Sequence, residues 1–363
     1  MENYFKMPFY AKTALIFISV FAFVYIMYIG QDIIIPIVYS TIFAILLNPF
    51  VNYLTRKKIS KIIAISIAVS LTVIVVLAIL YIIFSRINTF SESFPQFKLK
   101  IEQVSERLVR WISHEFNYSR TKIDKWMGER QIATVSSFAS GETLSQLGQL
   151  AITLMLFPVY LFMILYYKSL LLEFIRKLFK LEHHVTVVAV LTNSKTIIQS
   201  YLVGLVFEMI IMAVLNSVGL LFLGIDYAII LGILAAILNI IPYIGGIMAT
   251  LLPMFIAFAT KDSLIYPLLV FIVTIFIQFI DNNYIVPKIV ASRVQINALI
   301  SIIAVLVGGA LWGLSGMFLS IPLIAILKVI FDHIEPLKPW GFLLGNIVPT
   351  NTKFSFIKRK KIN

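Results

Sequence analysis

The stretch AIILGILAAILNIIPYIGGIMATLLPMFIAFA, residues 228–259, decides how this chain is built. It holds 32 residues without a charged side chain, and a helix of that length would reach about 48 Å. Because the hydrocarbon core of a bilayer is about 30 Å thick, the stretch is too long for one upright span and too short for two. Its centre reads NIIPYIGG, residues 239–246. Pro242 removes a backbone donor while Gly245 and Gly246 allow non-helical backbone, which predicts a broken helix.

Broken helices inside a membrane need protein or a water-filled cavity to satisfy their freed backbone groups. Secondary transporters place their substrate sites at such breaks. Asn239 adds a polar side chain directly before this break, and Tyr243 lies within it. We therefore interpret residues 239–246 as one wall of a transport site, where Asn239 binds a small polar solute and Tyr243 closes over it.

A second segment, residues 298–331, has the same design. It is 34 residues long, and Lys328 near its end carries its only charge. Its centre reads GGALWGLSG, residues 308–316, and Pro322 follows. The sequence thus predicts two broken or re-entrant helices in the C-terminal half.

The glycines of this second segment have two interpretations. Gly309 and Gly313 match the small-xxx-small spacing that lets helix backbones pack closely. Alternatively, Gly308, Gly309 and Trp312 form a second wall of the transport site, facing the first. Both interpretations stay open at this point.

Composition places the chain in the membrane. Of its 363 residues 60% are hydrophobic and 13% are charged, whereas a soluble domain is about 45–50% apolar and about 25% charged. The net charge of +13 resides in loops between apolar spans, so membrane topology explains it better than binding to nucleic acid. The absence of cysteine excludes disulfides, thiolate metal sites and cysteine nucleophiles.

The hydropathy pattern divides the chain into four parts. Residues 1–85 hold the N-terminal membrane spans, and residues 86–148 mix charges with helically spaced apolar residues, which is typical of an amphipathic extramembrane arm. Residues 149–350 form the transport core with both broken segments, and residues 351–363 form a basic tail. The fold class is an all-α polytopic membrane protein with about eight hydrophobic segments.

Lysine and arginine predict the topology. The N-terminus, the loop at 56–61, a basic loop at 168–200 and the C-terminal tail are positive, which places both termini in the cytoplasm. A span at 201–224 follows the second loop. If both broken segments cross the membrane, Lys288 faces out, and if both are re-entrant, it faces in. Its charge favours the re-entrant alternative.

Ionisable and amide side chains within the apolar spans are candidates for solute and ion binding. Glu208 lies eight residues into its span, and a carboxyl at that depth is costly unless it has a partner or a role. Gln278 and Asp281 lie one helical turn apart at the end of another span. We expect Glu208 to carry a proton, with a protonated structural glutamate as the alternative; Asp281 could also be an ordinary solvated residue.

Enzymatic classes fit poorly. The chain has no phosphate-binding GxxxxGK[ST] loop and no HExxH. Residues 313–316, GLSG, match the serine motif of rhomboid-type intramembrane proteases, yet none of the four histidines lies well inside an apolar span to serve as the base. The sequence therefore indicates neither an enzyme nor a cofactor or metal site.

Residues 201–345 resemble the autoinducer-2 exporter family. The matching motifs are YLVG at 201–204, IPYIGG at 241–246, QFID at 278–281, VPKI at 286–289, GG at 308–309, WGLSG at 312–316 and IP at 321–322. The resemblance implies a bacterial inner-membrane secondary transporter of about eight spans that forms a homo-oligomer. The family's functions include export of small furanone-type signals and, in some members, sodium/proton exchange.

Together these patterns favour a secondary transporter that exports a small polar solute or signal, coupled to a proton or sodium gradient. The competing class is a passive channel or a structural envelope protein, in which the glycines serve packing alone. An intramembrane protease is the least favoured.

Overall fold

The computed structural model describes residues 8–79, 81, 155–241, 244–291 and 295–346. Helices form all of its regular structure apart from one bridge between Ile296 and Gly345. Six helices in these ranges are long and apolar enough to cross a membrane, or seven if the bent pair Met155–Tyr166 and Lys168–Lys177 is one span. The predicted all-α polytopic membrane fold is confirmed. The predicted arm at 86–148 and the tail at 351–363 lie outside the described residues.

The described helices, in chain order, are α1 (Phe9–Ile29), α2 (Gln31–Arg56), an unlabelled helix Lys61–Ile79, an unlabelled helix Met155–Tyr166, α6 (Lys168–Lys177), α7 (His184–Phe222), α8 (Ala228–Asn239), α9 (Ile244–Thr260), α10 (Ile265–Ile280), α12 (Ala298–His333) and α13 (Lys338–Leu344). Short 3₁₀ turns precede α7 (Leu181–His183) and α13 (Glu335–Leu337). Two π-helical turns, Asp281–Ile285 and Pro287–Ala291, follow α10.

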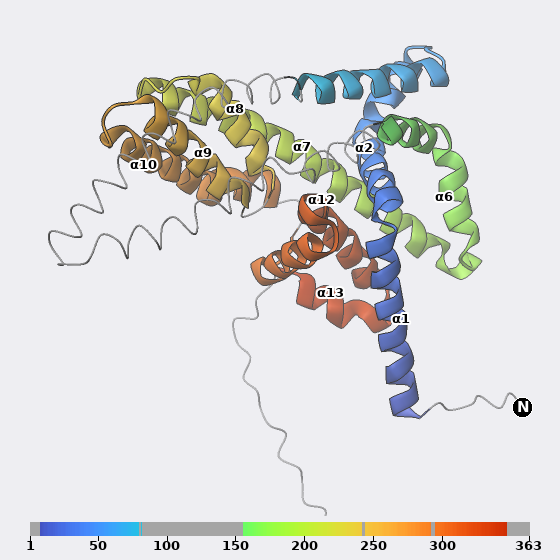
Figure 1. The fold of residues 1–363 in the computed structure, drawn as a ribbon. Helices are drawn as coiled ribbons and strands as arrows, with labels where there is room; N and C mark the ends of the chain where they lie inside the picture. Colours follow the sequence, from blue (N-terminus) through green and yellow to red (C-terminus); the bar gives the residue numbers. More distant parts are fainter. Residues whose placement is uncertain (1–7, 80, 82–154, 242–243, 292–294, 347–363) are drawn as a thin grey trace, which may run out of the picture.

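Helix α7 is the spine of the molecule (Figure 1). It contacts α2 and α12 in its first half and α8 and α10 in its second half. The boundary predicted between a loop at 168–200 and a span at 201–224 is wrong, because the helix already begins at His184. Residues 184–200 contain neither proline nor glycine, so nothing in the backbone stops the helix there.

The first broken segment is a helical hairpin. Helices α8 and α9 pack antiparallel, since Ala228 at the start of α8 and Ala257 near the end of α9 share one buried cluster. The turn between them includes Ile240 and Ile241, and a side-chain carbon added to Gly245 would overlap the Leu238 carbonyl. Because α8, with 12 residues, would reach only about 18 Å, this geometry favours the re-entrant alternative.

The second broken segment is also a hairpin. Helical geometry stops within α12 at Trp312 (φ −134°) and Gly313 (φ +59°), a backbone that side chains rarely tolerate. The two halves fold back on each other, because Ser320 Oγ donates to the Ala304 carbonyl oxygen at 2.8 Å. Gly308 and Gly316 meet at the crossing, where added side-chain carbons would overlap the other half. The turn at 312–313 thus lies midway in the sequence between 304 and 320 and between 308 and 316, the positions that meet across the hairpin.

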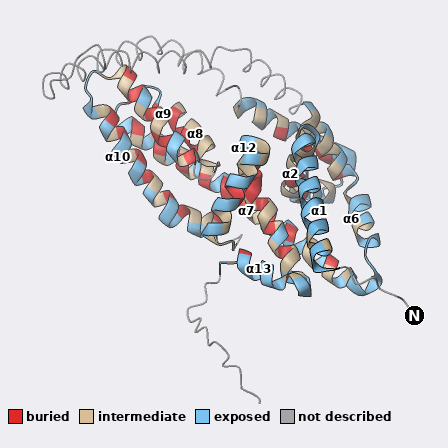
Figure 2. Ribbon diagram, turned by 60° about the horizontal axis from the view of Figure 1, so that its bottom comes forward, coloured by how far each residue is buried: buried red, intermediate tan, exposed pale blue. Residues whose placement is uncertain are grey.

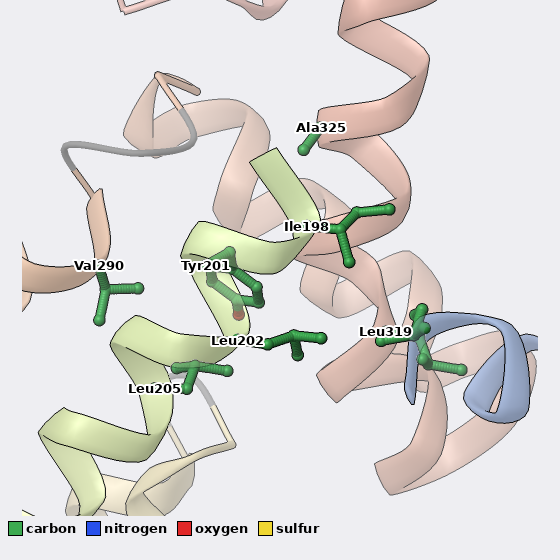
Figure 3. Close-up of a cluster of buried hydrophobic side chains, with 8 residues drawn as sticks. Ile198, Tyr201, Leu202, Leu205, Val290, Leu319 and Ala325 are labelled. Carbon is green, nitrogen blue, oxygen red and sulfur yellow. The ribbon is translucent and has the colours of Figure 1, made fainter. Parts of the chain in front are cut away.

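A buried apolar cluster holds the spine against the second hairpin (Figure 3). Tyr201, Leu202 and Leu205 of α7 contribute to it, with Leu319 of α12 from across the interface. Leu319 is fully buried. At roughly 1.5–3 kcal/mol for each buried large apolar side chain, this cluster fixes the position of α7 relative to α12.

The outermost helices expose apolar side chains (Figure 2). No residue of α1 is buried, and most of its side chains are apolar. A soluble protein would hide such a surface. Here the bilayer covers it.

We predict that Gly316→Ala destabilises the fold. The added methyl group meets the Gly308 backbone, and overpacking of this kind costs about 1–3 kcal/mol of unfolding free energy. The melting temperature of the purified protein in detergent should fall. Leu314→Ala, at an exposed position of the same hairpin, should leave it nearly unchanged. Equal melting temperatures for both variants would contradict the close contact between Gly308 and Gly316.

Candidate transport site

Four polar side chains converge from three helices. Glu208 lies on α7, Asn239 ends α8, Gln278 lies on α10, and Asp281 follows α10 directly. The antiparallel packing of α7 and α8 brings the first two together, because Ser217 Oγ donates to the Ile229 carbonyl oxygen at 3.2 Å and the helices run in opposite directions from that contact.

Asn239 bridges the two carboxyl groups. Its Nδ2 donates to Asp281 Oδ2 at 2.8 Å and to Glu208 Oε1 at 3.3 Å. Gln278 Nε2 donates in turn to Asn239 Oδ1 and to Asp281 Oδ2, each at 3.3 Å. The four groups form one hydrogen-bonded network in which each amide donates to a carboxyl oxygen.

One oxygen of this network is left over. Asp281 is 1% exposed and Glu208 is 6% exposed. Asp281 Oδ2 accepts two hydrogen bonds, whereas Oδ1 is buried and has no hydrogen-bond partner among the described residues. A buried polar atom without a partner costs about 1–3 kcal/mol and calls for an explanation in a native structure.

The network borders a cavity of about 900 Å³ lined by α7, α8, α9, α10, the π-helical turns after α10 and part of α12. The polar side chains in its described lining belong to Tyr201, Glu208, Asn239, Thr250, Gln278, Asp281, Asn282, Asn283 and Ser301. Apolar side chains such as Phe271, Ile275 and Phe279 form much of the remainder. A largely apolar cavity with a few convergent polar groups is the usual form of a small-molecule site.

The charge of this lining selects the kind of ligand. It contains two carboxyl groups and, among the described residues, no lysine, arginine or histidine. The carboxylates would repel an anion, while a cation or a neutral solute rich in hydroxyl groups finds oxygen acceptors and amide donors. The described residues contain no group of three or more histidine, aspartate or glutamate side chains of the kind that holds a metal ion.

An unusual backbone positions Asp281. It begins the first of the two π-helical turns that continue α10. Such turns are rare and occur frequently at functional sites. At Gly204 the neighbouring α7 approaches the second turn closely, since an added side-chain carbon would lie 2.8 Å from the Ile289 carbonyl oxygen.

The structure brings together five of the residues singled out in the sequence: Glu208, Asn239, Gly246, Gln278 and Asp281 line the cavity. Gly246 lies against Gln278, where an added carbon would be 3.0 Å from the side-chain Cδ. Gly245 serves the sharp turn behind them and is absent from the described lining. Pro242 and Tyr243 lie outside the described residues.

The glycine segment of α12 lies elsewhere. Gly308, Gly309 and Trp312 are absent from the described lining of the cavity. Trp312 Nε1 donates instead to the Met27 carbonyl oxygen of α1 at 2.9 Å. The segment packs closely at Gly308 and Gly316, whereas Gly313 of the predicted Gly309–Gly313 pair lies at the turn with no atom near enough to pack against it among the described residues.

Several lining residues were missed in the sequence. Tyr201 lies seven residues before Glu208, two helical turns along the same face, and this spacing could have identified it. Asn282, Asn283 and Ser301 carried no comparable signal. Asn216 is buried too, but its Nδ2 donates to the Met212 carbonyl oxygen of its own helix at 2.8 Å.

The chain is similar to known bacterial membrane proteins. Residues 16–335 match the profile of the AI-2E family transporter. The putative transport protein YhhT of Escherichia coli is 23% identical over 317 residues, 87% of this chain and 89% of that one. The AI-2 transport protein TqsA of the same species is 25% identical over 309 residues, 84% and 87%. The putative transport protein YrrI of Bacillus subtilis is 31% identical over 134 residues, which is 37% of each chain.

We predict that Asn239 and Asp281 are energetically coupled. Asn239→Ala removes the donor shared by two buried carboxyl groups, which should cost about 1–3 kcal/mol of unfolding free energy. In a double-mutant cycle with Asp281→Asn, read from melting temperatures in detergent, the two losses should deviate from additivity by about 0.5 kcal/mol or more.

Asn216→Ala is the matched control for this cycle. It removes a buried asparagine from the spine helix, outside the network. Its effect should add to that of Asp281→Asn. If the losses of unfolding free energy for Asn239→Ala and Asp281→Asn were also additive, the two residues would not be energetically coupled.

Proposed function

Because the chain belongs to the AI-2E transporter family, we propose that it is a secondary transporter that moves a small polar solute through the cavity bordered by Glu208 and Asp281. We further propose that a proton or a sodium ion bound by these carboxyl groups drives the movement, in the direction of export. A neutral solute rich in hydroxyl groups suits the lining, and the signal AI-2 named for the relative TqsA is a candidate cargo.

The observation that carries this proposal is the Oδ1 of Asp281, which has no hydrogen-bond partner among the described residues. It lies buried beside the cavity. Asn239 links its carboxyl group to the second buried carboxyl group, that of Glu208, by hydrogen bonds to both. A proton on this oxygen would supply a donor, and a sodium ion would supply a positive charge. A sodium ion would give this oxygen a partner that the described residues do not supply, and a proton would remove the negative charge of its carboxyl group.

Coupling follows from the shared donor. Asn239 Nδ2 holds carboxyl oxygens from two different helices, so a change of charge on either carboxyl alters the bond that Asn239 makes to the other. Asn239 also ends the short helix of the first hairpin. Binding of an ion thereby biases the position of this hairpin against α7 and α10, and a transporter needs such a differential preference between two conformations.

The setting of the protein completes the proposal. The chain is a multi-pass membrane protein, and we place it in the bacterial inner membrane with both termini in the cytoplasm, as its lysine and arginine pattern indicates. We also propose that it forms a homo-oligomer, with the apolar surface of α1 available to a second copy or to lipid.

We predict that purified protein in vesicles accumulates a small hydroxylated solute against its gradient when a proton or sodium gradient is imposed. A passive channel would only equalise the concentrations. A solute panel measured with both gradients therefore separates a coupled transporter from a channel, and equilibration under every imposed gradient would exclude coupling.

Glu208→Gln tests the role of charge in the same assay. The amide has nearly the shape of the carboxyl group but takes up no proton, so accumulation should fall to that of empty vesicles and its pH dependence should disappear. Glu182→Gln, at an exposed position outside the cavity lining, is the matched control. Unaltered pH dependence in Glu208→Gln would make this residue structural.

A further inference from the structure

Three lysines from separate elements gather around α2, away from the transport cavity. Lys168, at the start of α6, donates from Nζ to Asn48 Oδ1 of α2 at 2.8 Å. Lys61, at the start of the helix Lys61–Ile79, donates from Nζ to the Tyr166 carbonyl oxygen at 2.8 Å, two residues before Lys168. Both ammonium groups are thereby fixed at the same end of neighbouring helices.

The third lysine comes from the spine. Gln199 of α7 donates from Nε2 to the Ile45 carbonyl oxygen of α2 at 3.0 Å, which fixes the register of the two helices. Lys195 lies one turn from Gln199. Burial, and then the positive charges of Lys195 and Lys61, lower the pKa of Lys168, which lies at the bend between the helix Met155–Tyr166 and α6. Lys61 and Lys195 are thus each within electrostatic reach of Lys168.

Among the described residues, these three charges have no acidic counterpart. Within the described part of the chain, none of the three forms an ion pair with a carboxylate, although five such pairs involve other residues. Like charges held together repel, and the partial burial of Lys168 strengthens its repulsion from the other two. An anion bound between them would offset this cost.

The position of the lysines identifies the anion. Lys61 begins one apolar span, and Lys168 follows the apolar run at 149–167 and lies at the bend before α6. Both lysines thus lie at an end of an apolar run, where we place the membrane interface. The Tyr166 ring lies beneath Lys61 Nζ, 5.2 Å from it, as in the aromatic belt at a membrane interface. Ile62 and Ile63, next to Lys61, are each 54% exposed and offer an apolar surface beside the charge.

We propose that Lys61, Lys168 and Lys195 bind the headgroup phosphate of an anionic phospholipid, with its acyl chains against the exposed apolar side chains that follow Lys61. The leaflet is the cytoplasmic one, by the topology derived from charge. Basic pockets between helices on this side are suited to anionic headgroups, and each lysine near the surface adds to the attraction. The site is independent of the proposed transport activity.

The test is native mass spectrometry of the full-length protein in a mild detergent, titrated with phosphatidylglycerol and, separately, with phosphatidylcholine. Phosphatidylglycerol should bind in preference. The double variant Lys61→Gln, Lys195→Gln should weaken its binding by about tenfold or more. Lys168 stays in place in this variant because its bond to buried Asn48 supports the fold.

A second double variant, Lys177→Gln with Lys180→Gln, is the matched control. It removes the same charge from exposed positions at the end of α6 and shortly after it, and it should bind phosphatidylglycerol as the unaltered protein does. Lys195→Gln alone changes one exposed side chain, keeps the fold and should weaken binding by about threefold or more.

Three results would overturn the proposal. Equal weakening in both double variants would show that total charge alone attracts the lipid. Equal binding of phosphatidylcholine would show that the headgroup charge plays no part. Displacement of the lipid by inorganic phosphate at comparable concentration would identify a site for a soluble anion instead.

Discussion

The hydrogen bonds from Asn239 to two buried carboxyl groups are the interaction on which the membrane part of this structure depends. In a bilayer a polar side chain must find its partners within the protein, since lipid offers none. Glu208 and Asp281 lie on different elements, so a single amide that serves both fixes the spine, the end of α8 and the continuation of α10 at one point. Apolar side chains pack around this hydrogen-bonded point.

The sequence predicted the places where the chain breaks better than the arrangement of the pieces. Proline and paired glycine within long apolar segments are local signals, and both segments are indeed interrupted in the structure. Which breaks border the same cavity depends on how distant helices pack. Trp312 shows this, because its indole donates to α1 and its glycine neighbours let two half-helices cross, so it lies away from the cavity that Asn239 borders.

The candidate site was predictable where a polar residue interrupts an apolar run. Glu208, Asn239, Gln278 and Asp281 are each conspicuous for this reason, although nothing in the sequence showed that they share hydrogen bonds. Asn216 looks similar in the sequence and bonds to its own helix instead. The start of α7 was misplaced because lysine and threonine imitate a loop, whereas a helix that extends beyond the membrane carries such residues on its exposed face.

The continuity of α7 gives it a mechanical property. A straight helix of 39 residues is about 58 Å long, roughly twice the thickness of the hydrocarbon core. Glu208 and Lys195 lie on it about 20 Å apart along the axis. No proline interrupts the helix between them, so a tilt at the cavity moves the lysine end as a rigid lever. Whatever anchors that end also sets how far the helix can swing.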